Sequence, residues 1–264
     1  MAEVATQPDP WQSLAKFTAA RIGLGRAGGS VPTHALLAFQ LAHARARDAV
    51  LQDLDAEALA AELAGAGFET LHLASAAQNR QTFIARPDLG RILDDASRQK
   101  LEARPHATPF DCAVVVADGL SARAVATHAV PLLVELMGRL AQGGWRLAPV
   151  AVVQQGRVAI GDEIGALLPA RMTVLLIGER PGLSSPDSLG IYLTHDPLPG
   201  RSNAERNCLS NIRPPEGLSY ALAAHKLAYL MHEARRRKLS GVELKEDAPQ
   251  LALGNAADQL TQGR

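Results

Sequence analysis

The sequence is poor in the residues that mark several specialised classes of protein. Only two cysteines, Cys112 and Cys208, occur among its 264 residues, and neither has a Cys or His neighbour at a spacing typical of zinc sites. This argues against a disulfide framework and against a metal site, so we expect no metal ligands. Aromatic residues make up only 4% of the chain, which favours closely packed helices around an aliphatic core.

Net charge and long apolar runs are also lacking. The 27 basic residues balance 27 acidic ones, so no net field attracts nucleic acid or an anionic membrane. No apolar run approaches the roughly 18 to 20 residues of a membrane span, and residues 1–10 lack the basic-then-apolar pattern of a signal peptide. With 47% apolar residues, we expect a globular cytoplasmic protein that binds neither nucleic acid nor a membrane.

The apolar run at residues 171–177 is the clearest structural signal. A short run with β-branched residues, ended by Gly and Pro, predicts a strand buried on both faces, as in the middle of a parallel sheet. The loop that follows, residues 178–190, contains Glu179, Arg180 and Asp187, which a simple connection does not need. In open α/β sheets ligands bind beyond the carboxyl ends of strands, so this loop lies on the expected binding edge.

The order of the predicted elements indicates an α/β fold with a parallel, helix-covered sheet. Strands are expected over residues 71–74, 112–117, 147–153, 171–177 and 191–194. Helices are expected over residues 9–22, 33–51, 55–64, 88–101 and 219–238, with further helices between the later strands. Pro149 suggests an edge strand or a bulge, Pro131 a kink or a new helix start, and residues 204–218 an irregular segment.

The same pattern divides the chain into three parts. Residues 1–68 form a mostly helical N-terminal extension, residues 69–241 an α/β domain, and residues 242–264 a poorly patterned C-terminal tail. The extension either docks a partner subunit or covers one edge of the sheet. Residues 23–28 match the dinucleotide-binding pattern G-x-G-x-x-G, but a helical pattern precedes them, so we interpret them as a connection between helices.

Glycines accompany the ends of three expected strands, at residues 118–121, 155–158 and 178–182. They let a large ligand approach the backbone, whose N–H groups can bond amide or phosphate oxygens. No general-base His, metal cluster or nucleophile elbow accompanies them, so the edge predicts binding and no catalytic residue. The candidate binding residues from these strand ends are Asp118, Gly119, Ser121, Gly178 and Arg180.

Three residues leave alternatives open. Ser121 follows a strand through a tight turn, but the sequence around it lacks the second glycine of the hydrolase pattern G-x-S-x-G. Cys208 is either a nucleophile or a structural thiol. Glu179 is either bonded to a ligand amide or paired with Arg180 or Arg157.

Several motifs, in order along the chain, resemble the light-chain (small-subunit) family of ethanolamine ammonia-lyases. They occur at residues 18–28, 86–91, 117–121, 178–183 and 207–212, and the resemblance spans roughly residues 11–245. Each motif alone is weak, whereas the set in this order is specific.

The resemblance implies a subunit of an adenosylcobalamin-dependent lyase that converts ethanolamine to acetaldehyde and ammonia by a radical mechanism. It implies a Rossmann-like fold that closes over cobalamin at the interface with a large TIM-barrel subunit, in a hetero-oligomer in which this chain alone is inactive. By motif matching it implies that Val158, through its backbone N–H, Glu179 and Cys208 contact the cofactor. The D-x-H-x-x-G pattern of proteins that ligate cobalt through His is absent, which fits a cofactor that keeps its own base on the metal.

Two further expectations concern the protein's location in the cell and the alternative function. Family members from enteric bacteria carry a longer N-terminal extension that targets a bacterial microcompartment. This chain has only about ten residues before its first expected helix, which leaves packaging in a microcompartment open. The alternative function is a free-standing flavodoxin-like ligand-binding domain or a small hydrolase that uses the same strand ends.

Overall fold

The computed structural model describes residues 6–105 and 108–249. Its strands are β1 (Thr6–Gln7), β2 (Arg26–Ala27), β3 (Thr70–Ala74), β4 (Ala113–Ala117), β5 (Val150–Gln154), β6 (Met172–Gly178), β7 (Leu189–His195) and β8 (Arg206–Ile212). Its α-helices are α1 (Thr33–Leu51), α2 (Ala56–Gly65), α3 (Arg80–Ala85), α4 (Asp95–Glu102), α5 (Ala122–Leu140), α6 (Ile160–Leu167) and α7 (Tyr220–Arg237). The 3₁₀ helices are η1 (Pro10–Phe17), η2 (Leu89–Arg91), η3 (Asn203–Glu205) and η4 (Gly241–Glu243).

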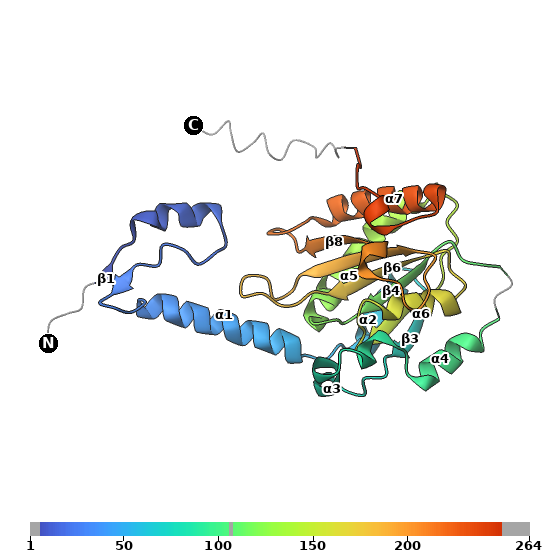
Figure 1. Cartoon of the computed structure of the whole chain (residues 1–264), viewed down its shortest axis with the longest axis horizontal. Coiled ribbons are helices and arrows are strands. Elements are labelled where there is room, and N and C mark those ends of the chain that lie inside the picture. Colours follow the sequence, from blue (N-terminus) through green and yellow to red (C-terminus); the bar gives the residue numbers. More distant parts are fainter. Residues whose placement is uncertain (1–5, 106–107, 250–264) are drawn as a thin grey trace.

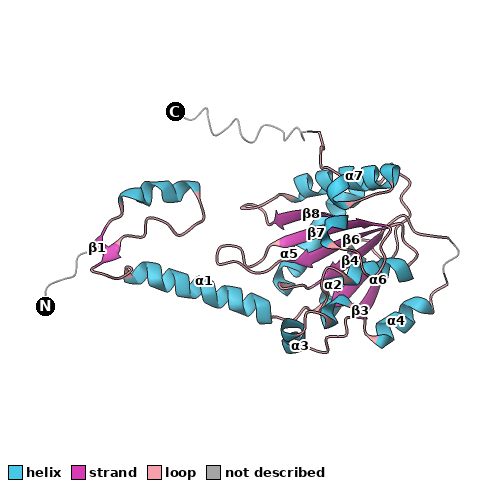
Figure 2. Ribbon diagram, in the orientation of Figure 1, coloured by secondary structure: helices cyan, strands magenta, loops and turns pink. Residues whose placement is uncertain are grey.

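A six-stranded sheet in the order β3-β5-β4-β6-β7-β8 forms the centre of the α/β fold (Figure 2). Strands β3 to β6 are parallel, as predicted, but β7 and β8 run antiparallel to their neighbours. The expectation of a wholly parallel sheet was therefore wrong at this end. A loop without a helix joins β6 to β7, and such a short connection returns the chain antiparallel to the strand that it leaves.

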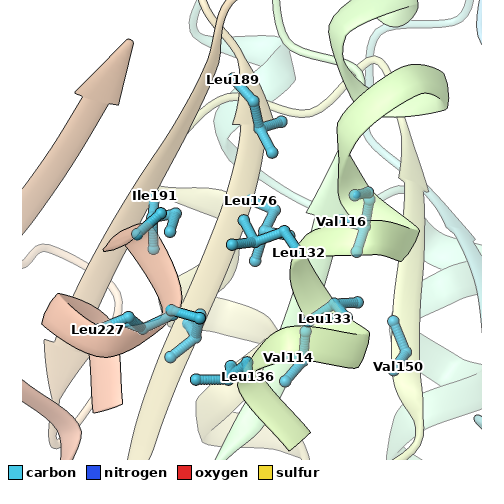
Figure 3. Close-up of a cluster of buried hydrophobic side chains, with 14 of the residues drawn as sticks. Val114, Val116, Leu132, Leu133, Leu136, Val150, Leu176, Leu189, Ile191 and Leu227 are labelled. Carbon is cyan, nitrogen blue, oxygen red and sulfur yellow. The ribbon is translucent and has the colours of Figure 1, made fainter. Parts of the chain in front are cut away.

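Helices cover both faces of the sheet. The larger hydrophobic layer lies between the sheet and helices α2, α5 and α7, and the smaller one lies beneath α4 and α6. In the larger layer, Leu132, Leu133 and Leu136 of α5 point at strand residues such as Val114 and Leu176 (Figure 3). These three leucines are fully buried, and each such side chain contributes about 1.5–3 kcal/mol by leaving water.

Several boundaries differ from the predicted ones because of local capping. The helix expected over residues 88–101 is split into η2 and α4, because the Asp94 carboxylate caps α4 by accepting from the Ser97 N–H at 2.7 Å. The short helix α3, capped by Asn79, was not predicted. Pro149 precedes β5, an inner strand, so the predicted edge position was wrong. Pro131 lies inside α5, which continues through it.

The N-terminal arm, residues 6–51, projects from the sheet-bearing body along α1 (Figure 1). The helix predicted over residues 9–22 is the shorter η1, after which the chain turns back to pair β2 with β1. Gly23 and Gly25 have φ of +62° and +76°, and a Cβ at either position would lie 2.6 Å from backbone atoms of this turn. The glycine pattern therefore forms a hairpin, which agrees with the rejection of a dinucleotide site. None of the helices within residues 6–105 and 108–249 is long and apolar enough to cross a membrane.

Candidate functional site

The neighbouring parallel strands β4 and β5 lead to helices on opposite faces of the sheet. Helix α5 follows β4 on the face of the larger hydrophobic layer, and α6 follows β5 on the other face. Such a reversal opens a crevice beyond the carboxyl ends of the two strands, where α/β folds bind ligands. Asp118, directly after β4, lies fully buried at the point of this reversal. Its buried carboxylate accepts hydrogen bonds from the N–H groups of Gln155 and Gly156, both at 3.0 Å.

Arg80 of α3 is the cationic partner of Asp118. Its Nη1 lies 3.3 Å from Asp118 Oδ2 and 2.8 Å from the Gly119 carbonyl oxygen, and its Nε donates to the Val50 carbonyl oxygen at 2.7 Å. The Arg80 side chain is only 5% exposed. Burial raises the pKa of Asp118 to about 6, although Arg80 and the backbone N–H groups favour the ionised form. Sequence reasoning missed Arg80, because its partners are brought together only by folding.

Gly119, Ser121 and Gly178 join the ends of β4 and β6. Gly119 has φ of +55°, and a Cβ there would lie 2.3 Å from the Gly178 carbonyl oxygen. The Ser121 hydroxyl caps α5 by accepting from the Ala124 N–H at 3.2 Å and donates to the Pro186 carbonyl oxygen at 2.9 Å. Ser121 is fully buried, so it is not presented as an exposed nucleophile. With Asp118, these residues lie beneath the edge and fix its backbone.

Val158, Glu179 and Cys208 meet on the face of the sheet that carries α4 and α6. Val158 packs against the smaller hydrophobic layer from the start of α6. Cys208 is exposed and pairs across β7–β8 with Tyr192, whose half-buried ring packs against the same layer. Strand alternation places Glu179 on the same side as the buried Ile177. Three segments distant in sequence thus bring the residues implied by the resemblance to one face.

Glu179 is held by hydroxyl groups and backbone. Its carboxylate accepts from Ser188 Oγ and Ser210 Oγ, each at 2.5 Å, and from the Asn211 N–H at 3.2 Å. Within residues 6–105 and 108–249 no ion pair joins it to Arg180 or Arg157, so the alternative of an arginine partner does not hold there. Because Ser210 and Asn211 belong to β8, Glu179 ties the end of β6 to that strand.

Two further features define this face. A buried ion pair between Arg206 of β8 and Asp162 of α6 holds β8 against that helix. Although Cys208 is exposed at one side, desolvation by its neighbours raises the pKa of its thiol, which makes it a weak nucleophile. Within residues 6–105 and 108–249 no group of three or more His, Cys, Asp or Glu side chains could hold a metal ion.

Arg180 is exposed and lines a cavity of about 600 Å³ between the strand ends and α1. Arg157, at the end of β5, lines the same cavity. The structure thus divides the predicted site residues into a buried set, Asp118, Gly119, Ser121 and Gly178, and an accessible set, Val158, Glu179, Cys208 and Arg180.

Comparisons with known proteins give a consistent result. Residues 8–245 match the family model described as ethanolamine ammonia-lyase light chain. The chain is similar to the ethanolamine ammonia-lyase small subunit of Azotobacter vinelandii, with 59% identity over 94% of this chain and 92% of that protein. The protein of the same name from Ralstonia nicotianae is 58% identical over 91% of this chain and 89% of its own length. The small subunit from Pseudomonas syringae pv. tomato is 57% identical over 92% of this chain and 85% of its own length.

Replacing Arg80 with Met tests whether its ion pair with Asp118 supports the edge. The substitution leaves a buried carboxylate without its cation, so we expect the free energy of unfolding to fall by about 3–5 kcal/mol near neutral pH. The folded-state pKa of Asp118, about 6, lies above the unfolded value of about 3.9. Stability from its protonation is therefore present at low pH and lost as pH rises through the folded pKa. Without Arg80 that pKa rises further, so the deficit of Arg80→Met should shrink as pH falls.

Urea unfolding at about pH 7.5 and about pH 5 measures this deficit. The double variant Arg80→Met/Asp118→Asn is the matched control, because it removes the buried charge as well and should recover part of the lost stability. A deficit that is equal at both pH values, with no recovery in the double variant, would contradict the assigned pairing.

Proposed function

Because this chain belongs to the ethanolamine ammonia-lyase light-chain family, we propose that it is the cobalamin-binding subunit of an adenosylcobalamin-dependent enzyme that converts ethanolamine to acetaldehyde and ammonia. The complete enzyme is a hetero-oligomer in which a large subunit holds the substrate and this chain closes over the cofactor at their interface. The observation that carries the proposal is the accessible sheet face with Val158, Glu179 and Cys208. No catalytic constellation accompanies that face in the described residues, so this chain is inactive alone.

The residues on this face fit the chemistry of cobalamin. The edge of a corrin ring carries amide side chains, which both donate and accept hydrogen bonds. The Val158 N–H, just before α6, has no hydrogen-bond partner among the described residues, as is usual for the first N–H groups of a helix. Glu179 supplies a carboxylate and Ser210 an exposed hydroxyl. Together they offer a donor and acceptors beside the uncharged thiol of Cys208.

The bound cofactor supplies homolysis of its cobalt–carbon bond, while the protein supplies placement and shielding. With cobalamin bound, the Val158 N–H would donate to a corrin amide, Glu179 would accept from one, and Cys208 would pack against the ring. Asp118, Gly119, Ser121 and Gly178 act from beneath by fixing the strand ends that carry these contacts. Arg180 directly follows Glu179 and lines the neighbouring cavity.

The proposal also assigns the parts of the chain. Residues 69–241 are a Rossmann-like cobalamin-binding domain, residues 1–68 the extension that docks the large subunit, and residues 242–264 a tail, of which positions 250–264 lie outside the described residues. Location in the cytoplasm and packaging in a bacterial microcompartment stay predictions.

Exposed apolar side chains on the N-terminal arm support the docking role. Trp11 is 66% exposed and Phe17 76%. Further exposed apolar residues of the arm are Leu14, Ile22, Leu24, Val31, Leu36, Leu37, Phe39, Leu41 and Leu51. So many large apolar groups in one projecting segment are typical of a surface that a protein partner covers.

An assay of ethanolamine deamination with adenosylcobalamin tests the function. We expect no activity from this chain alone and activity when the cognate large subunit is added. Activity of the chain alone would overturn the proposed division of labour. A well-formed complex without activity would overturn the proposed reaction.

Replacing Glu179 with Ala tests the cofactor contact. Loss of an acceptor for charge-assisted hydrogen bonds should weaken cobalamin binding to the assembled complex by about tenfold or more, measured by equilibrium titration. Glu179→Gln, which keeps the shape and one acceptor oxygen, should lose less. Glu135→Ala, at an exposed position on α5, is the control. Because Glu179 also holds β8, unfolding curves accompany the titration, and unchanged affinity in a folded Glu179→Ala variant would refute the contact.

Substitutions on the arm test docking. Phe17→Ser, and separately Arg21→Ala/Arg26→Ala, should weaken assembly with the large subunit, by about tenfold for the aromatic anchor, as measured by size-exclusion chromatography and titration. Val134→Ser removes an apolar side chain that is 51% exposed on α5 and should leave assembly unchanged. Normal assembly of both arm variants would count against the arm as the docking surface.

A further inference from the structure

The cavity beside the proposed cofactor face has an unusual lining. Its volume is about 600 Å³, and Val50, Ile84 and Leu120 form part of its apolar wall. Arg47, Arg157 and Arg180 line it as cations beside His43, and no Asp or Glu is among its lining residues in the described part of the chain. A cavity of this kind suits an anionic group that is attached to an apolar body.

The Arg157 side chain is positioned by the protein itself. Its guanidinium lies 4.1 Å from the centroid of the Phe83 ring and donates from Nη2 to the Phe83 carbonyl oxygen at 3.2 Å. Gly90 leaves room for it, since a Cβ at that position would lie 2.8 Å from Arg157 Cγ. A side chain held in this way loses little freedom when it binds a ligand.

Of the three lining arginines, Arg47 forms an exposed ion pair with Asp48 at 3.7 Å, whereas the charges of Arg157 and Arg180 are not neutralised in this way within the described residues. Burial lowers the pKa of Arg157 most, the neighbouring Arg80, Arg180 and Arg91 lower it further, and Asp118 is the carboxylate that opposes them. Asp118 is already bonded to Arg80. In residues 6–105 and 108–249, no ion pair engages Arg157 or Arg180, and Arg157 Nε is buried without a hydrogen-bond partner.

Resting on the proposed role in cobalamin binding, we propose that Arg157 and Arg180 bind the phosphodiester group of the cofactor's nucleotide tail. Arg157 immediately precedes Val158, and Arg180 immediately follows Glu179. Both arginines therefore leave the backbone directly beside the proposed corrin contacts. Arginine binds phosphate oxygens well because its planar fork matches their geometry. The apolar wall of the cavity suits the base and sugar that adjoin a phosphodiester. A carboxylate of the large subunit is the competing source of an oxyanion.

Comparing the binding of cobalamin and cobinamide distinguishes the phosphodiester of the cofactor from a carboxylate of the large subunit. Cobinamide keeps the corrin ring and its amides but lacks the nucleotide tail and its phosphodiester. Each ligand is titrated by visible absorption into the assembled two-subunit complex, with no turnover. Arg157→Met, which keeps an apolar chain against Phe83, and Arg180→Met should each weaken cobalamin binding by about tenfold or more. Both variants should change cobinamide binding by less than about twofold.

Two controls accompany the titration. Arg157→Lys keeps the charge without the fork and should lose less affinity for cobalamin than Arg157→Met does. Arg171→Met removes one positive charge at the opposite end of β6, where the side chain is 63% exposed, and should affect neither ligand. Thermal unfolding of each variant establishes that it is folded.

The possible results lead to distinct conclusions. An equal loss of affinity for both corrinoids would overturn the phosphodiester contact, because the arginines would then support the face as a whole. Weaker assembly in the absence of any corrinoid, with the preference for cobalamin unchanged, would place the oxyanion on the large subunit and also overturn it. A wild-type complex that binds neither corrinoid would overturn the proposed cobalamin role itself.

Discussion

The functional edge depends on one buried carboxylate, Asp118, at the junction of β4 and β5. An ionised carboxylate is costly to bury unless charge and hydrogen bonds compensate it, and here Arg80 and two backbone N–H groups of the loop after β5 do so. The loop after β5 must therefore stay at this position, which fixes the backbone that leads to Val158. Because Arg80 also bonds the Val50 carbonyl oxygen, the same interaction sets the point where α1 leaves the body.

Elements with a strong local signal could be predicted from sequence. Helix α1 has the predicted bounds, and the apolar runs of β4 and β6 identified buried strands within a residue or two. Strand β8 was missed because it alternates polar residues with a few apolar ones, and its strand form depends on pairing with β7. Helix α3 has only six residues, too few for a helical period. Its stability comes from the contacts of Arg80 and Phe83 with other elements.

The candidate site also contains residues that could be predicted from sequence and residues that could not. Strand-end glycines were predictable from sequence, and the close approach of β4 and β6 requires them at Gly119 and Gly178. The sequence could not tell which neighbouring side chains are exposed and which face the interior, since Asp118 and Arg180 both follow the end of a strand within two residues. Arg157 was considered only as a possible partner of Glu179, because its environment combines Phe83, Gly90 and three arginines that only the tertiary fold assembles.

The loop between β6 and β7 connects the proposed cofactor face with the proposed docking arm. It begins at Glu179, and further along the Leu183 carbonyl oxygen accepts from Arg21 while the Ser184 hydroxyl donates to the Ala19 carbonyl oxygen, both at 3.3 Å. A large subunit that holds the arm therefore also restrains this loop, and a cofactor that restrains the loop must favour docking by the same free energy. Two exposed hydrogen bonds of about 0.5–1.5 kcal/mol each limit the coupling through this path to about 1–3 kcal/mol. That is enough for cofactor and large subunit to favour each other's binding about five- to a hundredfold.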